Sequence, residues 1–177
     1  MIVKNINDRI KEYFFLNPTV KLRVRQIERE LKLPLPSVIR YTKELEKEGI
    51  LKKEETSGAV FFSSDRTSKY FLLEKRLFNI KLLFESGLMD FIIKEYSNPV
   101  IIVFGSYSKG EDIENSDIDL YIQSSSKKEI KLEKFESILK RKIQVFVYSN
   151  INKINNDHLA NNIINGIILN NILEIFK

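Results

Sequence analysis

The chain has 177 residues, of which 43% are hydrophobic and 30% are charged, a composition typical of globular proteins with one substantial domain or two small ones. It contains no cysteine, which excludes a disulfide framework, a thiolate metal site and a cysteine nucleophile. No apolar run approaches the length of a membrane-spanning helix, and the N-terminus lacks the pattern of a signal peptide. We therefore expect a cytoplasmic protein with no membrane partner.

The net charge of +5 lies entirely in the N-terminal part of the chain. Residues 1–70 contain 15 Lys and Arg against 10 Asp and Glu, whereas residues 71–177 contain 14 of each. This asymmetry indicates a boundary near residues 63–70, and a basic first part favours nucleic acid as its partner. The predicted domains are residues 1–66 and residues 67–177, with residues 67–98 as connecting helices.

The first domain shows the pattern of three short helices. Asn7 is placed to cap the first helix, and residues 24–31 carry apolar side chains at helical spacing in the second. A third helix opens at Pro36 or Ser37 and continues to Gly49, which is suited to a left-handed stop. These three helices predict a small helical core at the start of the chain.

A β-hairpin is expected after the third helix. Residues 50–55 and 60–63 alternate loosely around a turn at residues 56–59. The order helix, helix, turn, helix, hairpin is that of a winged helix-turn-helix. The run SVIRYTKELEKEGIL, residues 37–51, resembles the recognition helix and first wing strand of many prokaryotic winged-helix regulators.

The resemblance to winged-helix regulators implies a duplex DNA partner. In that family the start of the recognition helix enters the major groove, and the wing lies within reach of the backbone. An alternative is a winged helix that docks only onto protein, which the acidic residues Glu44, Glu46 and Glu48 favour. The residues expected at DNA are Ser37, Arg40, Lys43, Lys52 and Lys53.

Two further helices are predicted between the domains. Residues 68–85 and 88–96 are rich in apolar side chains at helical spacing, and Ser86-Gly87 separates them. We expect these helices to cover the sheet of the second domain. The alternative is that they pair with a second copy of the chain, which would make a homodimer.

The stretch VIIVFGSYSKGEDIENSDIDLYIQ contains the main candidate binding residues of the second domain. Residues 100–104 form an unbroken apolar run, typical of a strand that is buried on both faces. Gly105 ends this run, and a helix that begins at Ser106 offers free N–H groups and a hydroxyl to an anion. Asp117 and Asp119 then lie on one face of a second strand, about 7 Å apart, because strand side chains alternate. Two such carboxylates can share a pair of Mg²⁺ ions.

The order strand, Gly-Ser, loop, Asp-x-Asp resembles the signature of the DNA polymerase beta nucleotidyltransferase superfamily, and most closely its minimal nucleotidyltransferases. The resemblance implies a small mixed β-sheet backed by helices, so the whole chain is expected to be α+β. It implies that Gly105 and Ser106 hold the β- and γ-phosphates of an NTP, while Asp117 and Asp119 bind two Mg²⁺ ions, with Mn²⁺ as the alternative metal. One ion would activate an acceptor hydroxyl and the other would steady the pyrophosphate leaving group. The matching positions are Gly105, Ser106, Gly110, Ser116, Asp117, Asp119 and Leu120.

Two positions depart from the family pattern. On the next strand, KIQVFVY, Gln144 occupies the place of a third carboxylate, and a neutral amide lacks the charge and general-base capacity of a carboxylate. Tyr107 stands where an Arg is common in the family, whereas Lys109 keeps a cation close to the phosphates. The loop acids that are candidates to replace the missing carboxylate are Glu111, Asp112 and Glu114.

Helices are also expected in the C-terminal part of the chain. Residues 155–177 have helix-forming spacing, interrupted at Gly166. A shorter helix is predicted over residues 129–140, with its inward side chains at Ile130, Phe135 and Ile138.

Three functions remain open at this point. The first is transfer of a nucleoside monophosphate from an NTP to a hydroxyl acceptor. The second is a DNA-binding regulator whose transferase domain has lost a carboxylate and senses or holds a nucleotide. The third, by analogy, is an antitoxin with a toxin protein as its partner. Gln144 is the residue that separates the first hypothesis from the second.

Overall fold

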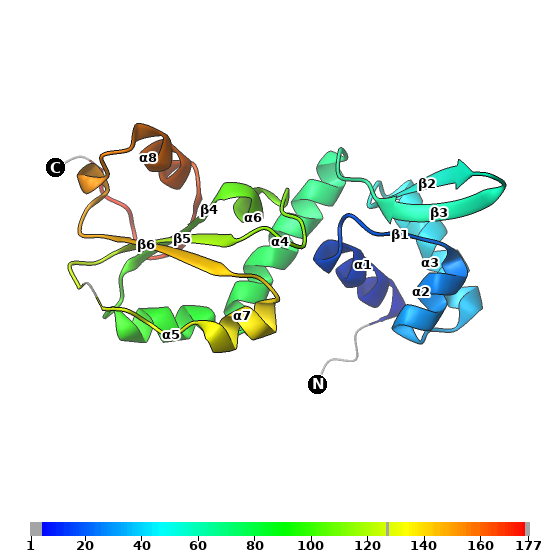
Figure 1. The fold of residues 1–177 in the computed structure, drawn as a ribbon, viewed down its shortest axis with the longest axis horizontal. Coiled ribbons are helices and arrows are strands. Elements are labelled where there is room, and N and C mark those ends of the chain that lie inside the picture. The colour runs from blue at the N-terminus through cyan, green and yellow to red at the C-terminus, as the bar shows by residue number, and fades with distance from the viewer. Residues whose placement is uncertain (1–4, 127, 176–177) are drawn as a thin grey trace. The chain divides into compact units, whose positions relative to one another are not determined.

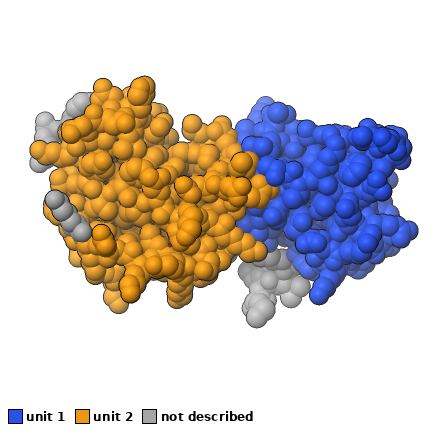
Figure 2. All heavy atoms as spheres, viewed as in Figure 1, with its two compact units in different colours: residues 1–78 blue, residues 79–177 orange. Residues whose placement is uncertain are grey.

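A computed structural model describes residues 5–126 and 128–175 of the chain. The chain divides into two compact units, residues 1–78 and residues 79–177 (Figure 2). Each unit has its own sheet and its own hydrophobic core. Residues 67–78, expected to be connecting helix, belong to the first unit. Within the described residues, no helix has both the length and the apolar character needed to cross a membrane.

The first unit combines short helices with a three-stranded antiparallel sheet of order β1-β3-β2 (Figure 1). Its core contains Phe14, Ile27, Leu45 and Phe62, each at most 4% exposed, so every helix before the hairpin contributes to it. The elements are α1 (Ile6–Leu16), β1 (Lys21–Leu22), α2 (Val24–Leu31), α3 (Leu35–Lys47), β2 (Leu51–Thr56), β3 (Ala59–Ser64) and α4 (Lys69–Glu85), which continues into the second unit.

The first helix begins earlier than predicted. Asn5, and not Asn7, is its N-cap, because the Asn5 side-chain oxygen accepts a hydrogen bond of 2.9 Å from the backbone N–H of Asp8. Asn7 lies inside α1 and is half-buried. The predicted second helix is confirmed by the limits of α2.

Residues with a left-handed backbone conformation end the third helix and form the turn of the hairpin. Gly49 follows α3 with φ 71°, the left-handed stop expected from the sequence. Ser57 and Gly58 connect β2 to β3 with φ values of 51° and 71°. The predicted hairpin is therefore confirmed, with Leu51–Thr56 paired antiparallel to Ala59–Ser64.

The second unit is built on a mixed sheet, as predicted, and the order of its strands is β6-β5-β4-β7. The pair β5–β6 is parallel, whereas β4 pairs antiparallel with both β5 and β7. The elements are α5 (Leu88–Glu95), β4 (Val100–Phe104), α6 (Gly105–Lys109), β5 (Ile118–Gln123), α7 (Glu133–Leu139), β6 (Ile143–Tyr148), the 3₁₀ helix η1 (Ile151–Lys153), α8 (Asp157–Ile164) and β7 (Ile167–Asn170).

Helices cover both faces of this sheet (Figure 1). On one face, α5 and α7 pack with Val103 and Leu120 in one apolar cluster. On the other, α8 and η1 pack with Ile102, Phe104 and Tyr121 in a second cluster. All five residues of β4 are buried, which confirms the predicted strand with two buried faces.

The helix before β6 is shorter than predicted. It occupies Glu133–Leu139 and not residues 129–140, and Ile138 is 47% exposed while Leu139 is 1% exposed. The inward stripe therefore joins Phe135 to Leu139 at a spacing of four residues, and Ile138 faces away from the core.

A strand replaces the predicted helix after Gly166. A Cβ atom at Gly166 would lie 2.6 Å from the backbone oxygen of Val103, so glycine permits a close approach to β4. The following residues pair with β4 as the strand β7, because the apolar segment covers an open edge of the sheet. The last two residues of the predicted helix, 176–177, lie outside the described part of the chain.

Candidate functional site

Gly105, the first residue of α6, brings the backbone against the side chain of Asp119. Gly105 has φ 71°, and a Cβ atom there would lie 2.5 Å from Asp119 Oδ2. The preceding residue, Phe104, pairs with Asp119 across the antiparallel ladder between β4 and β5. Both the backbone conformation and the contact with the carboxylate therefore require glycine at this position.

Ser106 lies in the first turn of the short helix α6 and is half-buried. Gly110, with φ 75°, is the C-cap of this helix, and the backbone N–H of Glu111 donates to the carbonyl oxygen of Ser106 at 3.0 Å. Lys109 is the last residue of α6 and is exposed. The Gly-Ser step is thus held by a closed helical turn.

Tyr107, at the position where the family commonly has Arg, is a core residue. It is 3% exposed and belongs to the apolar cluster under α5 and α7. Burial, followed by the negative charge of Asp112, raises the pKa of its phenol well above the ordinary value. Tyr107 therefore supplies packing at this position and no cation.

The two predicted metal-binding carboxylates differ in exposure. Asp117 immediately precedes β5 and is exposed, whereas Asp119 lies within β5 and is half-buried. Burial raises the pKa of Asp119, and the negative charge of Asp117 raises it further. The two carboxylates are therefore close enough to interact, as the alternation of the strand predicts.

Gln144 lies beside Asp119 in the parallel ladder. The register pairs Asp119 of β5 with Gln144 of β6, and paired residues in adjacent strands place their side chains on the same face. Gln144 is exposed, so its amide group is accessible next to the half-buried carboxylate. The position where the resemblance to nucleotidyltransferases implies a third carboxylate thus holds a neutral group.

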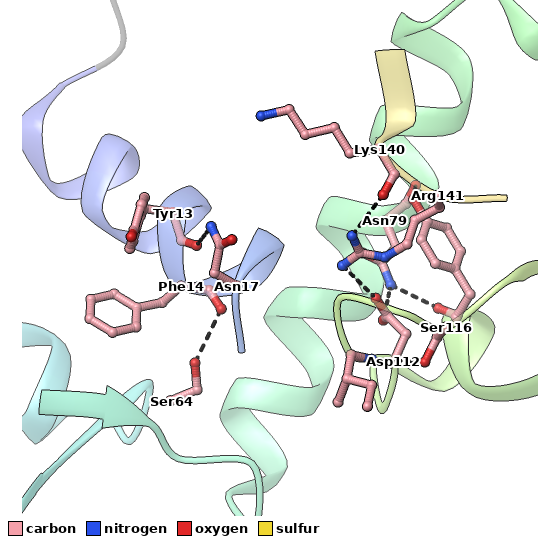
Figure 3. A network of polar contacts seen from close by, with 11 residues as sticks. Tyr13, Phe14, Asn17, Ser64, Asn79, Asp112, Ser116, Lys140 and Arg141 are labelled. Atoms are coloured by element: carbon pink, nitrogen blue, oxygen red, sulfur yellow. Dashed lines mark hydrogen bonds and ion pairs between the residues drawn. The ribbon is translucent and has the colours of Figure 1, made fainter. Parts of the chain in front are cut away.

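Asp112, a candidate to replace the missing carboxylate, is instead buried in a structural ion pair. Its exposed fraction is 1%, and its Oδ2 atom lies 3.7 Å from the Nη2 atom of Arg141 (Figure 3). The amide of Asn79 donates to Asp112 Oδ1 at 2.7 Å and to the carbonyl oxygen of Tyr107 at 2.9 Å. These contacts tie α4, α6 and the segment before β6 to the loop between the Gly-Ser and Asp-x-Asp steps.

The other two loop acids do not complete a metal cluster either. Glu111 is exposed and Glu114 is half-buried. Among the described residues, no group of three or more Asp, Glu, His or Cys side chains is arranged to hold a metal ion. The expectation that a loop acid substitutes for the missing carboxylate is therefore not supported.

A pocket of about 520 Å³ opens beside Asp117. Lys142, to which no role was assigned from the sequence, lies on its wall, and its ammonium group contacts Glu136 Oε2 at 2.9 Å. Glu136 raises the pKa of Lys142, and the charges of Glu133 and Asp117 add to the effect. The sequence holds a signal for Lys142: the alternation of side chains along the strand KIQVF places Lys142 on the same face as Gln144. The lining is Glu114, Asn115, Ser116, Asp117, Glu133, Glu136, Ser137, Lys140, Arg141 and Lys142.

The residues expected at DNA lie on α3 and β2 of the first unit. Ser37 is half-buried, and Arg40, Lys43, Lys52 and Lys53 are exposed. The last two are neighbours on β2, so their side chains point to opposite faces of the hairpin.

Two of these basic residues have acidic partners within the first unit. The Arg40 guanidinium lies 3.6 Å from the Glu44 carboxylate and 4.3 Å from the ring centre of Tyr41. Lys52 contacts Glu54 at 3.0 Å. The electrostatic attraction that these two side chains can offer to a phosphate is therefore partly offset by carboxylates of the same unit.

Comparison with known proteins agrees with the geometry of the second unit. Residues 87–170 match the family model described as a nucleotidyltransferase domain. No curated protein and no solved structure matches the chain. The matched range includes Gly105, Ser106, Asp117, Asp119 and Gln144 together with the strands that carry them. Residues 87–170 of the second unit are therefore similar to nucleotidyltransferase domains.

Proposed function

We propose that the second unit binds a nucleoside triphosphate with Mg²⁺, and that it transfers the nucleoside monophosphate to a hydroxyl acceptor slowly or not at all. The observation that carries the proposal is the corner formed by Gly105 and Asp119, where the backbone of the Gly-Ser step closes onto a carboxylate. Asp117 lies near this carboxylate, and Gln144 lies beside it in the ladder.

The donor set at this corner suits Mg²⁺ that arrives with a nucleotide. Mg²⁺ is usually held by one or two carboxylates together with substrate phosphates, and less often by a cage made only of protein groups. Asp117 and Asp119 supply two carboxylates, and the described residues add no third acid. A bound ion would neutralise phosphate charge and activate the acceptor hydroxyl. Mn²⁺ takes the same oxygen ligands and is the alternative metal.

The other residues of the corner have separate roles in this proposal. Gly105 lets the phosphates approach the backbone closely, because it has no side chain. The hydroxyl of Ser106 donates a hydrogen bond to a phosphate oxygen, and Lys109 supplies a cation at the end of the same helix. Gln144 has hydrogen-bonding capacity but cannot take up a proton from the acceptor, which limits transfer.

Calorimetry tests the binding part of the proposal. Each of the four common NTPs is titrated with Mg²⁺ into the full chain and into the variants Asp117→Asn and Asp119→Asn. Both substitutions should remove most of the affinity, and so should a chelator. Asp90→Asn is the matched control, since Asp90 is an exposed acid on α5. Equal affinity of the wild type and the Asp117→Asn protein would show that the assignment is wrong.

We infer a second function, duplex DNA binding, for the first unit. Its support is the charge excess of residues 1–70, together with the exposed basic side chains on α3 and β2 and the element order α1, β1, α2, α3 and the β2–β3 hairpin. Together the two proposals describe a DNA-binding regulator whose second unit senses or holds a nucleotide. The neutral Gln144 favours this regulator over an efficient transferase.

A salt titration tests the DNA proposal. The logarithm of the affinity of the full chain for duplex DNA should fall with the logarithm of the salt concentration, by about 0.9 per phosphate neutralised. Lys53→Ala should weaken binding to all sequences alike, whereas Arg40→Ala should reduce the discrimination between sequences if Arg40 reads a base. Lys94→Ala, an exposed lysine on α5, is the control. If the wild type shows no salt-sensitive binding, the first unit is a protein-docking module.

A further inference from the structure

A second pocket lies within the first unit, between α3 and the β2–β3 hairpin. Its volume is about 370 Å³, within the usual range for small-molecule sites in proteins. The elements that line it are labelled in Figure 1. The lining of this groove is Val24, Ile39, Thr42, Lys43, Glu46, Lys47, Lys53, Val60 and Phe62.

The floor of the groove is apolar. Val24, Ile39, Val60 and Phe62 come from three different elements and converge on it. Ile39 is 41% exposed, while its neighbour Val38 on α3 is fully buried in the core. Ile39 therefore presents apolar surface to the groove that the core of the unit does not use.

The rim of the groove is positively charged. Lys43, Lys47 and Lys53 are exposed, and none of them forms an ion pair with another residue of the described chain. Against these three ammonium groups the lining holds a single carboxylate, that of Glu46. By contrast, Lys52 on the opposite face of β2 is paired with Glu54. The cations without an acidic partner thus surround the apolar floor.

We propose that this groove binds a small organic anion with an apolar body, an aliphatic or aromatic carboxylate. The apolar body covers Ile39, Val60 and Phe62, and the carboxylate lies between Lys47 and Lys53. A DNA phosphate would satisfy the lysines but leave the apolar floor uncovered. A stable protein partner would contact about 20–30 residues on each side. Only nine residues line this groove.

An anion bound in the groove should compete with DNA for the first unit. This part of the proposal rests on the DNA binding proposed above. Lys43 and Lys53 belong both to the rim and to the set expected at DNA. A bound carboxylate neutralises charge on the surface that would face the phosphates, so the anion and the DNA compete. The groove would then make DNA binding responsive to a metabolite of this chemical class.

The first experiment measures the site without DNA. The probe is 1-anilinonaphthalene-8-sulfonate, an apolar anion whose fluorescence rises in an apolar environment. Titration of the full chain should give saturable enhancement with one site. Lys47→Gln with Lys53→Gln should weaken the probe roughly ten-fold if each charge contributes about three-fold, as partly exposed charge pairs do. Ile39→Ala should also weaken it, because the substitution removes part of the floor.

Matched controls decide whether the signal comes from this groove. Lys52→Gln removes a charge one residue from Lys53 but on the other face of the hairpin, and it should leave the affinity for the probe unchanged. Decanoate should displace the probe, whereas decyltrimethylammonium, with the same chain and opposite charge, should not. Absence of saturable binding, equal effects of Lys52→Gln and Lys53→Gln, or equal displacement by both amphiphiles would overturn the proposal.

The second experiment separates the groove from the DNA function. Decanoate at saturating concentration should weaken DNA binding by the wild type and should have little effect on the Ile39→Ala protein. If the wild type binds DNA with the same affinity in the presence of decanoate, the competition is wrong. If the wild type binds no DNA at all, both the proposed DNA function and the proposed competition are wrong. The fluorescence titration alone then tests the anion site.

Discussion

Asp119 and Gln144 are direct neighbours across the parallel ladder of β5 and β6, and they share one face of the sheet. A carboxylate at position 144 would stand where a third acid completes the site. We expect Gln144→Asp to tighten the binding of Mg²⁺ with NTP and to raise any measurable transfer rate, because the new carboxylate supplies both charge and a proton acceptor. Calorimetry and release of pyrophosphate are the measurements.

The control for Gln144→Asp must add the same charge elsewhere in the second unit. Asn152→Asp does so at an exposed residue of η1, and it should leave both quantities unchanged. The wild type should turn over far more slowly than about 1 s⁻¹, the lower end of the usual range for enzymes. A wild-type rate at or above that value would contradict the degenerate-site interpretation.

Gly105 gives a second test of the same corner. We expect Gly105→Ala to abolish nucleotide binding and to destabilise the unit, because the new Cβ would lie 2.5 Å from Asp119 Oδ2 at a residue with φ 71°. Gly87→Ala is the matched control, since Gly87 has φ 77° with no atom within 4 Å of its Cβ position. It should show only the backbone strain, about 1 kcal/mol. Equal unfolding free energies and equal nucleotide affinities for the two variants would contradict the close contact.

Much of the fold follows from local patterns of the sequence. The limits of α2, the hairpin and the buried strand β4 agree with apolar periodicity and turn residues, because these signals act within a few residues. The strand β7 does not, because its pairing with β4 depends on an open sheet edge far away in the chain. Helical and strand spacing are ambiguous for a short run such as Ile167–Asn170.

The candidate site, like the fold, is only partly predictable from the sequence. Strand alternation predicts the shared face of Asp117 and Asp119, and the motif order predicts that Gly105 adjoins them. The role of Asp112 is not readable from sequence, because its partners Asn79 and Arg141 lie 33 and 29 positions away. A loop acid that is buried in an ion pair and one that reaches a metal have the same local pattern.

The buried pair of Asp112 and Arg141 should stabilise the loop that joins the two motif steps. We expect Arg141→Met to lower the free energy of unfolding of the second unit by about 3 kcal/mol, because it leaves a carboxylate buried without its cation. Asp112→Asn should cost less, since the amide keeps some of the hydrogen bonds. The double variant should be more stable than the sum of the two losses implies. Urea unfolding measures all three, and strictly additive losses would show that the pair is not coupled.

Tyr121 should make the second unit sensitive to alkaline pH. Its side chain is fully buried, and burial raises the pKa of its phenol to about 12, above the ordinary value of 10.0. Between these two values the unfolded chain loses the proton while the folded chain retains it. The stability from this group is therefore complete below pH 10.0 and is lost as the pH rises toward about 12.

The alkaline loss attributable to Tyr121 can be measured by substitution. The free energy of unfolding should fall less steeply from pH 10 to 12 in the Tyr121→Phe protein than in the wild type, by roughly 2 kcal/mol over the interval. Tyr148→Phe, at a half-buried tyrosine of β6, is the comparison. Parallel pH profiles for the wild type and Tyr121→Phe would show that the phenol ionises without cost in the fold.

Glu54 should restrain DNA binding by the first unit. Its carboxylate contacts Lys21 of β1 and Lys52 of β2, and hydrogen bonds from these two ammonium groups, that of Lys21 first, lower the pKa of Glu54. Glu54→Gln should release both cations for DNA phosphates. The affinity for duplex DNA at low salt should then rise, and the salt slope should steepen by about 0.9 for each phosphate gained.

Glu55→Gln is the control, because Glu55 lies on the opposite face of β2 and forms no ion pair within the described residues. Both substitutions change the net charge equally, so a gain confined to Glu54→Gln would place Lys21 and Lys52 at the DNA backbone. An equal gain for both would mean that only the total charge matters, and this face of the hairpin would then have no specific part in binding.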